Sequence, residues 1–169
     1  MLKYIEVALS PLEVPQETAL CIYISGCLHR CKDCHYPELQ LPDYGEALSD
    51  HYADILDLYL RQASCVCFLG EGRCGSEERE EFQRFVACAK AKGLKTCLYS
   101  GRDVDIEPWM QSFDYLKLGS YRPSRGPLSN PNTNQRMFRK EGNVFRDITP
   151  LLWQKASKEG CEKLDGLHC

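Results

Sequence analysis

The chain has 169 residues, of which 43% are hydrophobic and 27% are charged, and its formal net charge at pH 7 is -3. This length suits a single domain, which we place at residues 1–160, followed by a mobile tail at 161–169. No apolar run reaches the roughly 18 residues of a membrane span, no secretory signal opens the chain, and the charge offers no global field for nucleic acid or lipid. We therefore expect a cytoplasmic protein that binds neither membranes nor nucleic acid.

Taken in chain order, the residue pattern predicts strands that alternate with helices. Runs of β-branched and aromatic residues predict strands at 4–9, 19–24, 65–69, 94–99 and 115–118. Helical periodicity predicts helices at 46–62, 76–92 and 106–112, the second of them capped by Ser76 and stopped by Gly93. Such alternation is typical of parallel strands joined by right-handed crossovers.

The last third of the chain is expected to contain a long loop, a hairpin and a final helix. Residues 121–135 are rich in proline, serine, asparagine and glycine, which favours turns, and the length of this loop suggests a function. The segments 136–139 and 143–145 are predicted to form a hairpin. Thr149-Pro150 suits the start of a last helix that ends near Gly160.

The most informative feature is a group of three cysteines, Cys27, Cys31 and Cys34, spaced CxxxCxxC directly after a predicted strand. Four thiolates normally complete a four-iron, four-sulfur (4Fe-4S) cluster, so three on one loop hold three irons and leave the fourth open. A zinc site made of these cysteines and His35 is the first alternative, but structural zinc sites usually draw ligand pairs from two separated places. Unligated thiols are the second alternative. The spacing favours the cluster.

The remaining cysteines do not suggest a disulfide framework. The chain has eleven cysteines, and an odd number cannot all pair within one molecule. Those among apolar neighbours are predicted to be buried as small hydrophobic residues, namely Cys21, Cys65, Cys67, Cys88 and Cys97. Those in polar or terminal surroundings are interpreted as exposed thiols or a second metal site, namely Cys74, Cys161 and Cys169.

The run 25–35 resembles the cluster loop of radical S-adenosylmethionine (SAM) enzymes. Three further stretches resemble, in the same order, the anaerobic ribonucleoside-triphosphate reductase activating proteins, a small family of glycyl radical enzyme activases: 116–121, 126–128 and 133–136. The resemblance covers roughly residues 3–148. It implies an α/β fold, the partial, incomplete β/α barrel of the small radical SAM type.

The resemblance also implies a reaction, that of a radical SAM oxidoreductase. The open iron would bind the amino and carboxylate groups of SAM, and the reduced cluster would cleave its carbon–sulfur bond to give a 5′-deoxyadenosyl radical. In this family that radical removes hydrogen from a glycine Cα of the reductase, which stores a glycyl radical. The implied partners are the large subunit of anaerobic ribonucleotide reductase, or another glycyl radical enzyme, and a flavodoxin- or ferredoxin-like electron donor. The open side of an incomplete barrel suits a protein loop as substrate.

Residues after the strand at 65–69 are assigned to the cofactor by the same resemblance. Relatives have a pair of glycines followed by an acid that meets the methionine amino group. Here the order is Gly70, Glu71, Gly72, so the acid is displaced by one residue. Either Glu71 takes this role through a shifted turn, or backbone carbonyls alone do.

Three more residues are candidates for cofactor contacts. Ser100 and Gly101 end the next strand, where relatives meet the ribose or the adenine, and a plain strand-ending turn is the alternative. Asp33 stands where many members of the superfamily place an aromatic residue on the adenine. Tyr36 either substitutes for that residue or simply covers the cluster.

Asn134, Gln135 and Arg136 resemble the terminal motif of the activase family, which either closes the cofactor site or faces the reductase. Basic residues give this region a local positive charge, which suits an acidic partner or a solvated face: Arg122, Arg125, Arg136, Arg139 and Lys140. Two other functions stay open. One is radical chemistry on another glycyl radical enzyme or a small molecule, and the other is a non-catalytic iron–sulfur or zinc-binding module, suggested by the displaced Glu71 and the surplus of cysteines.

Overall fold

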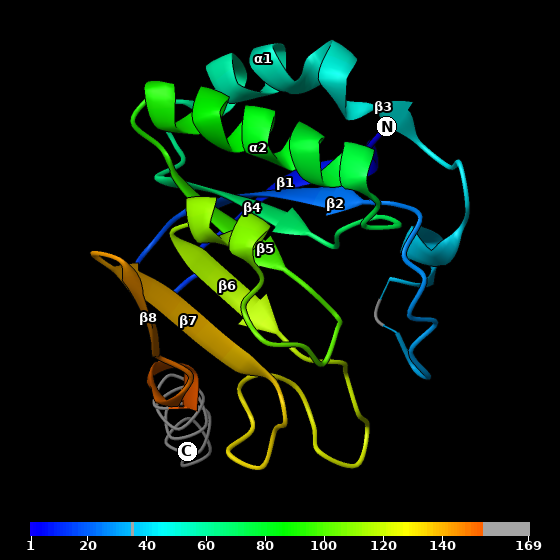
Figure 1. The fold of residues 1–169 in the computed structure, drawn as a ribbon, viewed down its shortest axis with the longest axis vertical. Coiled ribbons are helices and arrows are strands. Elements are labelled where there is room, and N and C mark those ends of the chain that lie inside the picture. The colour runs from blue at the N-terminus through cyan, green and yellow to red at the C-terminus, as the bar shows by residue number, and fades with distance from the viewer. Residues whose placement is uncertain (35, 154–169) are drawn as a thin grey trace, which may run out of the picture.

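The computed structural model describes residues 1–34 and 36–153, which build one sheet with its two long α-helices on one face (Figure 1). The strands are β1 (Lys3–Ser10), β2 (Ala19–Ile24), β3 (Glu46–Ala47), β4 (Cys65–Leu69), β5 (Lys95–Tyr99), β6 (Tyr115–Leu118), β7 (Arg136–Glu141) and β8 (Val144–Asp147). They are connected in part by the α-helices α1 (Leu48–Tyr59) and α2 (Ser76–Ala91) and the 3-10 helices η1 (Pro37–Gln40) and η2 (Pro108–Ser112). The order of strands in the sheet is β3-β1-β2-β4-β5-β6-β7-β8.

The four central strands, β2, β4, β5 and β6, are parallel, as the alternation of strands and helices predicted. Antiparallel strands flank this centre, with β1 beside β2 and β7 beside β6. The predicted hairpin is confirmed as β7 and β8, which pair antiparallel. The sheet is open, with β3 and β8 at its two edges, and the partial barrel stays a prediction.

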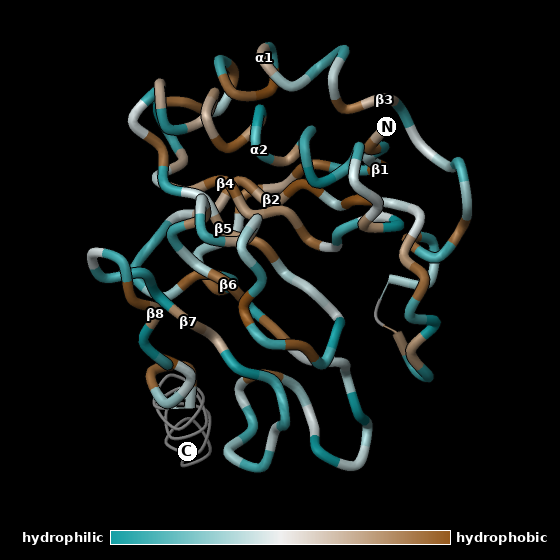
Figure 2. Tube along the Cα trace, viewed as in Figure 1, coloured by the Kyte–Doolittle hydropathy of each residue, from teal (hydrophilic) through white to brown (hydrophobic). Residues whose placement is uncertain are grey.

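Alternation along the central strands divides their side chains between two faces. On β2, Leu20, Ile22 and Ile24 face the helices and belong to the larger buried cluster, together with Phe68 of β4 and Phe82 of α2. The Phe68 and Phe82 rings meet edge to face with centroids 5.3 Å apart. Figure 2 shows the apolar residues gathered along β2 and β4, while the long loops after β6 are mostly hydrophilic. This helix-covered face supplies the main core.

The opposite face of the sheet carries a second buried cluster, built around cysteines. Cys21, Cys67 and Cys97 lie in register on β2, β4 and β5 and are fully buried, as is Cys65. Burial raises the pKa of the Cys97 thiol to about 11, so it stays protonated at neutral pH. The prediction of buried hydrophobic cysteines is confirmed for these four. Cys88 is only half-buried.

The ends of several elements differ from the sequence predictions. The helix predicted from residue 46 begins at Leu48, because Glu46 and Ala47 pair with β1 as the short strand β3. The N-cap of α2 is Gly75, not Ser76, because the Glu78 carboxylate three residues later accepts the Gly75 N–H at 3.0 Å.

The C-terminal predictions are tested only in part. Residues 150–153 are helical, whereas the rest of the helix predicted to Gly160 and the tail predicted at 161–169 lie outside the described residues, as do Cys161 and Cys169. Within the described ranges, we find no helix with the length and apolar character that crossing a membrane demands.

Candidate functional site

The three-cysteine loop leaves the sheet at the carboxyl end of β2 and is tied down near its start. The Ser25 hydroxyl donates to the Tyr44 carbonyl at 2.5 Å, and the Cys27 N–H donates to the Leu39 carbonyl at 2.8 Å. The thiols of Cys27, Cys31 and Cys34 are all half-buried. The loop therefore presents its thiols from a fixed base at the edge of the sheet where parallel strands usually bind ligands.

The electrostatics of the three thiols suit a cationic ligand. Burial raises the pKa of the Cys27 thiol, and the nearby Cys31 and Cys34 thiols raise it further, while the backbone N–H of His29 lowers it. A cation bound among the three thiols would offset this effect on Cys27. Iron–sulfur clusters take Cys as the thiolate, so these residues fit that group.

No three His, Cys, Asp or Glu side chains of residues 1–34 and 36–153 are arranged so that they could hold a single metal ion. A mononuclear zinc site requires its ligands to converge on one ion. In a 4Fe-4S cluster each thiolate binds a different iron, so the same convergence is not required. His35, the fourth ligand of the zinc alternative, lies outside the described residues.

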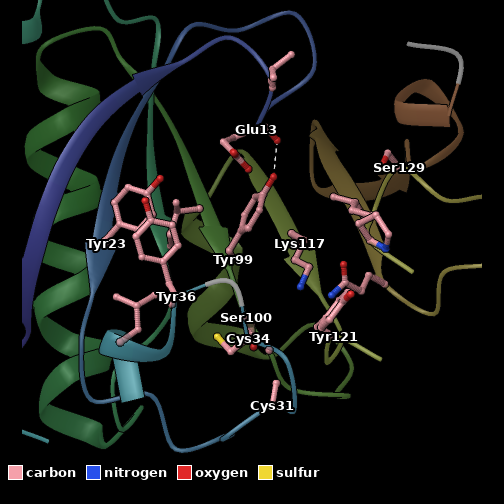
Figure 3. Close-up of a pocket in the computed structure, with 18 of the residues that line it drawn as sticks. Glu13, Tyr23, Cys31, Cys34, Tyr36, Tyr99, Ser100, Lys117, Tyr121 and Ser129 are labelled. Carbon is pink, nitrogen blue, oxygen red and sulfur yellow. Dashed lines mark hydrogen bonds between the residues drawn. The ribbon is translucent and has the colours of Figure 1, made fainter. Parts of the chain in front are cut away.

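A cavity of about 580 Å3 lies beside the loop, along the carboxyl ends of the parallel strands (Figure 3). Its volume falls within the range of about 300–1,000 Å3 that is usual for ligand sites. Cys31 and Cys34 line it, whereas Cys27 does not. The predicted cofactor residues that line it are Tyr36, Gly70, Ser100 and Gly101. The structure thus brings most of the predicted site to one cavity.

One row of strand side chains forms much of the cavity wall, and the sequence predictions missed it. Tyr23, Leu69, Tyr99 and Lys117 occupy paired positions on β2, β4, β5 and β6. The Tyr99 hydroxyl donates to the Glu13 carbonyl at 2.5 Å. Each of these side chains lies at or next to the end of its strand, so strand alternation together with the parallel register would have found them.

Tyr36 packs against the aromatic part of this wall. Its ring and that of Tyr23 have centroids 4.5 Å apart and are tilted by 38°. Figure 3 shows the two rings side by side at one end of the cavity. Tyr36 therefore offers the cavity an aromatic surface that the Tyr23 ring supports. A planar ligand could stack on such a surface.

Glu71 does not line the cavity, because its carboxylate is engaged inside the protein. It accepts the Ser100 hydroxyl at 2.7 Å and the Arg102 Nε–H at 2.6 Å, and its residue is 3% exposed. Arg102 also pairs with Glu107 at 2.6 Å, and this pairing, helped by the Trp109 N–H, lowers the pKa of Glu107 to about 2. At the cavity surface, the strand end after β4 presents Gly70 rather than Glu71 or Gly72.

Cys74 belongs to this internal network rather than to an exposed surface. The thiol is half-buried and lies 3.5 Å from the second carboxylate oxygen of Glu71. Burial raises the pKa of Cys74, and the negative charge of Glu71 raises it further. The structure gives Cys74 no further His, Cys, Asp or Glu partners among the described residues that would form a second metal site with it.

Gly70 allows the chain to turn closely beneath the three-cysteine loop. Its φ of +104° disfavours any residue with a Cβ, and a Cβ here would lie 3.0 Å from the Ile24 carbonyl oxygen. Gly93, which ends α2, also has a positive φ of +78° but has open space around it. A substitution at Gly93 therefore tests backbone strain alone, whereas a substitution at Gly70 adds a steric clash to the strain.

We expect Gly70→Ala to lower the free energy of unfolding by about 2–4 kcal/mol, because strain and overpacking add. Gly93→Ala, the matched control, carries the strain alone and should cost about 1–2 kcal/mol. Urea denaturation of both variants measures the difference. Equal losses would show that the turn at Gly70 has room that the structure does not show.

The three residues of the terminal motif separate in space. Gln135 is buried and lines the 580 Å3 cavity, whereas Asn134 and Arg136 line a neighbouring hollow of about 720 Å3. The Asn134 amide donates to the Ser120 carbonyl at 3.0 Å. Among the predicted basic residues, Arg122 and Arg139 each pair with an acid, Asp103 at 2.9 Å and Glu141 at 2.7 Å, which reduces the positive charge of this face.

Comparison with known proteins bears directly on the three-cysteine loop. The family model of the 4Fe-4S single cluster domain matches residues 17–111, which are more than half of the chain and include Cys27, Cys31 and Cys34. Searches of the curated proteins and of the solved structures gave no match. The match covers β2, the cysteine loop and the strand ends after β4 and β5 that form the cavity. The chain therefore belongs to the 4Fe-4S single cluster domain family.

Proposed function

We propose that this protein is a radical SAM activase, which uses a 4Fe-4S cluster on Cys27, Cys31 and Cys34 to cleave SAM reductively. The observation that carries the proposal is the meeting of two of these cysteines with the ends of parallel strands in one cavity. Three thiolates leave one iron of such a cluster without a protein ligand. An open iron beside a cavity of ligand size would give SAM a place to bind.

The chain's own residues would bind and shield the cofactor. When bound, the cluster supplies the electron that splits the carbon–sulfur bond of SAM. The Tyr36 and Tyr23 rings offer a stacking surface for adenine, and the Gly70 backbone, free of a side chain, offers carbonyl contacts to the methionine amino group. The largely apolar lining of the cavity would help to keep water from a reactive intermediate.

The substrate proposed for this radical is a glycine Cα of anaerobic ribonucleotide reductase, and the reaction would install a glycyl radical there. The proposal for this target is supported by the resemblance of residues 116–121, 126–128 and 133–136 to the activase family. Another glycyl radical enzyme or a small molecule are the alternative substrates. Two features fit a protein substrate: the sheet is open, and the loop 121–135 contributes residues to the cavity lining.

The test is SAM cleavage by anaerobically reconstituted protein. With dithionite as reductant, we expect 5′-deoxyadenosine and methionine to form from SAM, measured by liquid chromatography. Cys31→Ala, treated identically, is the control for reactions of loosely bound iron and should form neither product. A wild-type protein that carries a reducible 4Fe-4S cluster but never cleaves SAM would refute the activase proposal. The reductase target is then tested by electron paramagnetic resonance (EPR) of the glycyl radical after mixing with the partner.

A non-catalytic iron–sulfur module is the second candidate, and the position of Glu71 favours it. Relatives of the radical SAM type use an acid after this strand to meet the SAM amino group, and here the acid is held by Ser100 and Arg102. Such a module would reduce and reoxidise its cluster without binding SAM. Equilibrium dialysis of SAM against the loaded protein separates the two candidates.

A further inference from the structure

Lys117 is a buried cation in the wall of the cavity. It lies on β6, its residue is 8% exposed, and it lines the cavity together with Cys31 and Cys34. Figure 3 shows its amine between Tyr99 and Tyr121, directed toward the side of the cavity where the two cysteines lie. An ammonium group is costly to bury unless an anion or several acceptors offset its charge.

The described residues give Lys117 few partners. The amine has three donor hydrogens, and the structure provides one acceptor, the Gly119 carbonyl at 2.9 Å, and the face of the Tyr99 ring at 5.8 Å. No carboxylate of the described residues forms an ion pair with it. Burial lowers the pKa of Lys117 to about 8, so the amine is still mostly protonated at neutral pH.

Three side chains raise the pKa of Lys117 when they carry a negative charge, and these are Cys31, Asp103 and Glu13, in decreasing order of effect. Asp103 is already neutralised by Arg122 at 2.9 Å and by two hydrogen bonds from Ser120. Glu13 also lines the cavity, and Figure 3 places it beyond Tyr99, away from the cysteines. The charge that Lys117 faces is therefore chiefly that of the three-cysteine loop.

The charge on that loop becomes fixed and larger when iron binds. Three thiolates give an oxidised 4Fe-4S cluster a net negative charge, and one added electron makes it more negative. A cation held in a buried wall is screened little by salt, and it stabilises the reduced form more than the oxidised form. Charge near a cluster is one of the means by which a protein sets its reduction potential.

We propose that Lys117 is the electrostatic partner of the cluster and raises its reduction potential. The inference rests on the part of the proposed function that places the cluster on Cys27, Cys31 and Cys34, and it does not depend on SAM cleavage. Lys117 touches neither the iron nor a substrate in this role. Lys117 acts on the cluster only through its positive charge, across the cavity.

The test compares Lys117→Met with Lys117→Arg in the reconstituted protein without SAM. Potentiometric titration followed by EPR gives the ratio of reduced to oxidised cluster at a fixed potential. We expect Lys117→Met to lower this ratio by roughly tenfold, which corresponds to about 59 mV for one electron. Lys117→Arg retains the charge and should stay within about threefold of the wild type. Lys140→Met, which removes a half-buried lysine of β7 that does not line the cavity, is the control and should not shift the potential.

Several outcomes would overturn the proposal. Equal potentials in Lys117→Met and wild type would do so, and so would an equal shift in Lys140→Met. Weaker SAM binding at an unchanged potential would identify Lys117 as a ligand anchor instead. If Lys117→Met does not fold or load iron, Lys117→Gln replaces it, and the same fall in potential is expected. Failure of SAM cleavage leaves the titration unaffected, so the two proposals are tested separately.

Discussion

Replacing Cys27, Cys31 or Cys34 singly by alanine is expected to remove the iron–sulfur cluster. Each thiolate is the only protein ligand of one iron in the proposed arrangement, so one substitution leaves a second iron open and the cluster labile. Changes in groups that merely surround a metal already weaken binding by about 10–100-fold. We therefore expect iron and sulfide contents at least about tenfold below those of the wild type, measured chemically after anaerobic reconstitution and by visible absorbance.

The matched control for these variants is Cys88→Ala. Cys88 is also half-buried, but it lies on α2, on the helix-covered side of the sheet. It should load iron and sulfide as the wild type does. A variant of one loop cysteine that keeps a full, stable cluster would place that cysteine outside the ligand set and contradict the proposed three-cysteine site. Equal loss in Cys88→Ala would instead point to a general effect of cysteine substitution on folding.

Arg102→Ala is expected to destabilise the protein more than any change at an exposed ion pair. The substitution leaves the Glu71 carboxylate, 3% exposed as a residue, without its main positive partner, and it also removes the closer of the two arginines that pair with Glu107. Breaking a buried pair in this way typically costs about 3–5 kcal/mol. Urea denaturation should show this loss. Arg139→Ala, which breaks an exposed pair with Glu141, should cost less than about 1 kcal/mol.

A double substitution distinguishes the lost attraction from the cost of an unpaired charge. Glu71→Gln combined with Arg102→Ala removes the buried charge as well as its partner, so it should be more stable than Arg102→Ala alone. The thermal midpoints of the two variants give this comparison directly. If the double variant is the less stable of the two, the carboxylate of Glu71 is not the source of the destabilisation.

The sequence predicted the centre of the fold better than its edges. The parallel strands β2, β4, β5 and β6 are short apolar runs between helices, and local pattern is enough to find them. The short strand β3 was missed because Glu46 and Ala47 extend only through pairing with Lys3 and Tyr4, more than 40 residues away in the chain. The 3-10 helix η1 was also missed, since its four residues are too few to show a helical period.

The predictable part of the candidate site consists of residues whose chemistry is indicated by their local spacing in the sequence. The three cysteines follow a recognisable pattern, and Ser100 and Gly101 end a visible strand. The neutralisation of Glu71 was not predictable, because Arg102 reaches it from a different loop, 31 positions along the chain. The burial of Lys117 was missed because lysine is almost never fully buried, although strand alternation and the parallel register place it beside Tyr99.

Neighbouring residues near the ends of the central strands face different surroundings, the core on one side and the cavity on the other. Phe68 belongs to the helix-covered core while Leu69 borders the cavity, and the same holds for Leu98 beside Tyr99 and for Leu116 beside Lys117. At these strand ends a substitution on the cavity side can alter the ligand site while the neighbouring core residue keeps its packing. Ligand specificity and core packing are thus assigned to adjacent residues, one peptide unit apart.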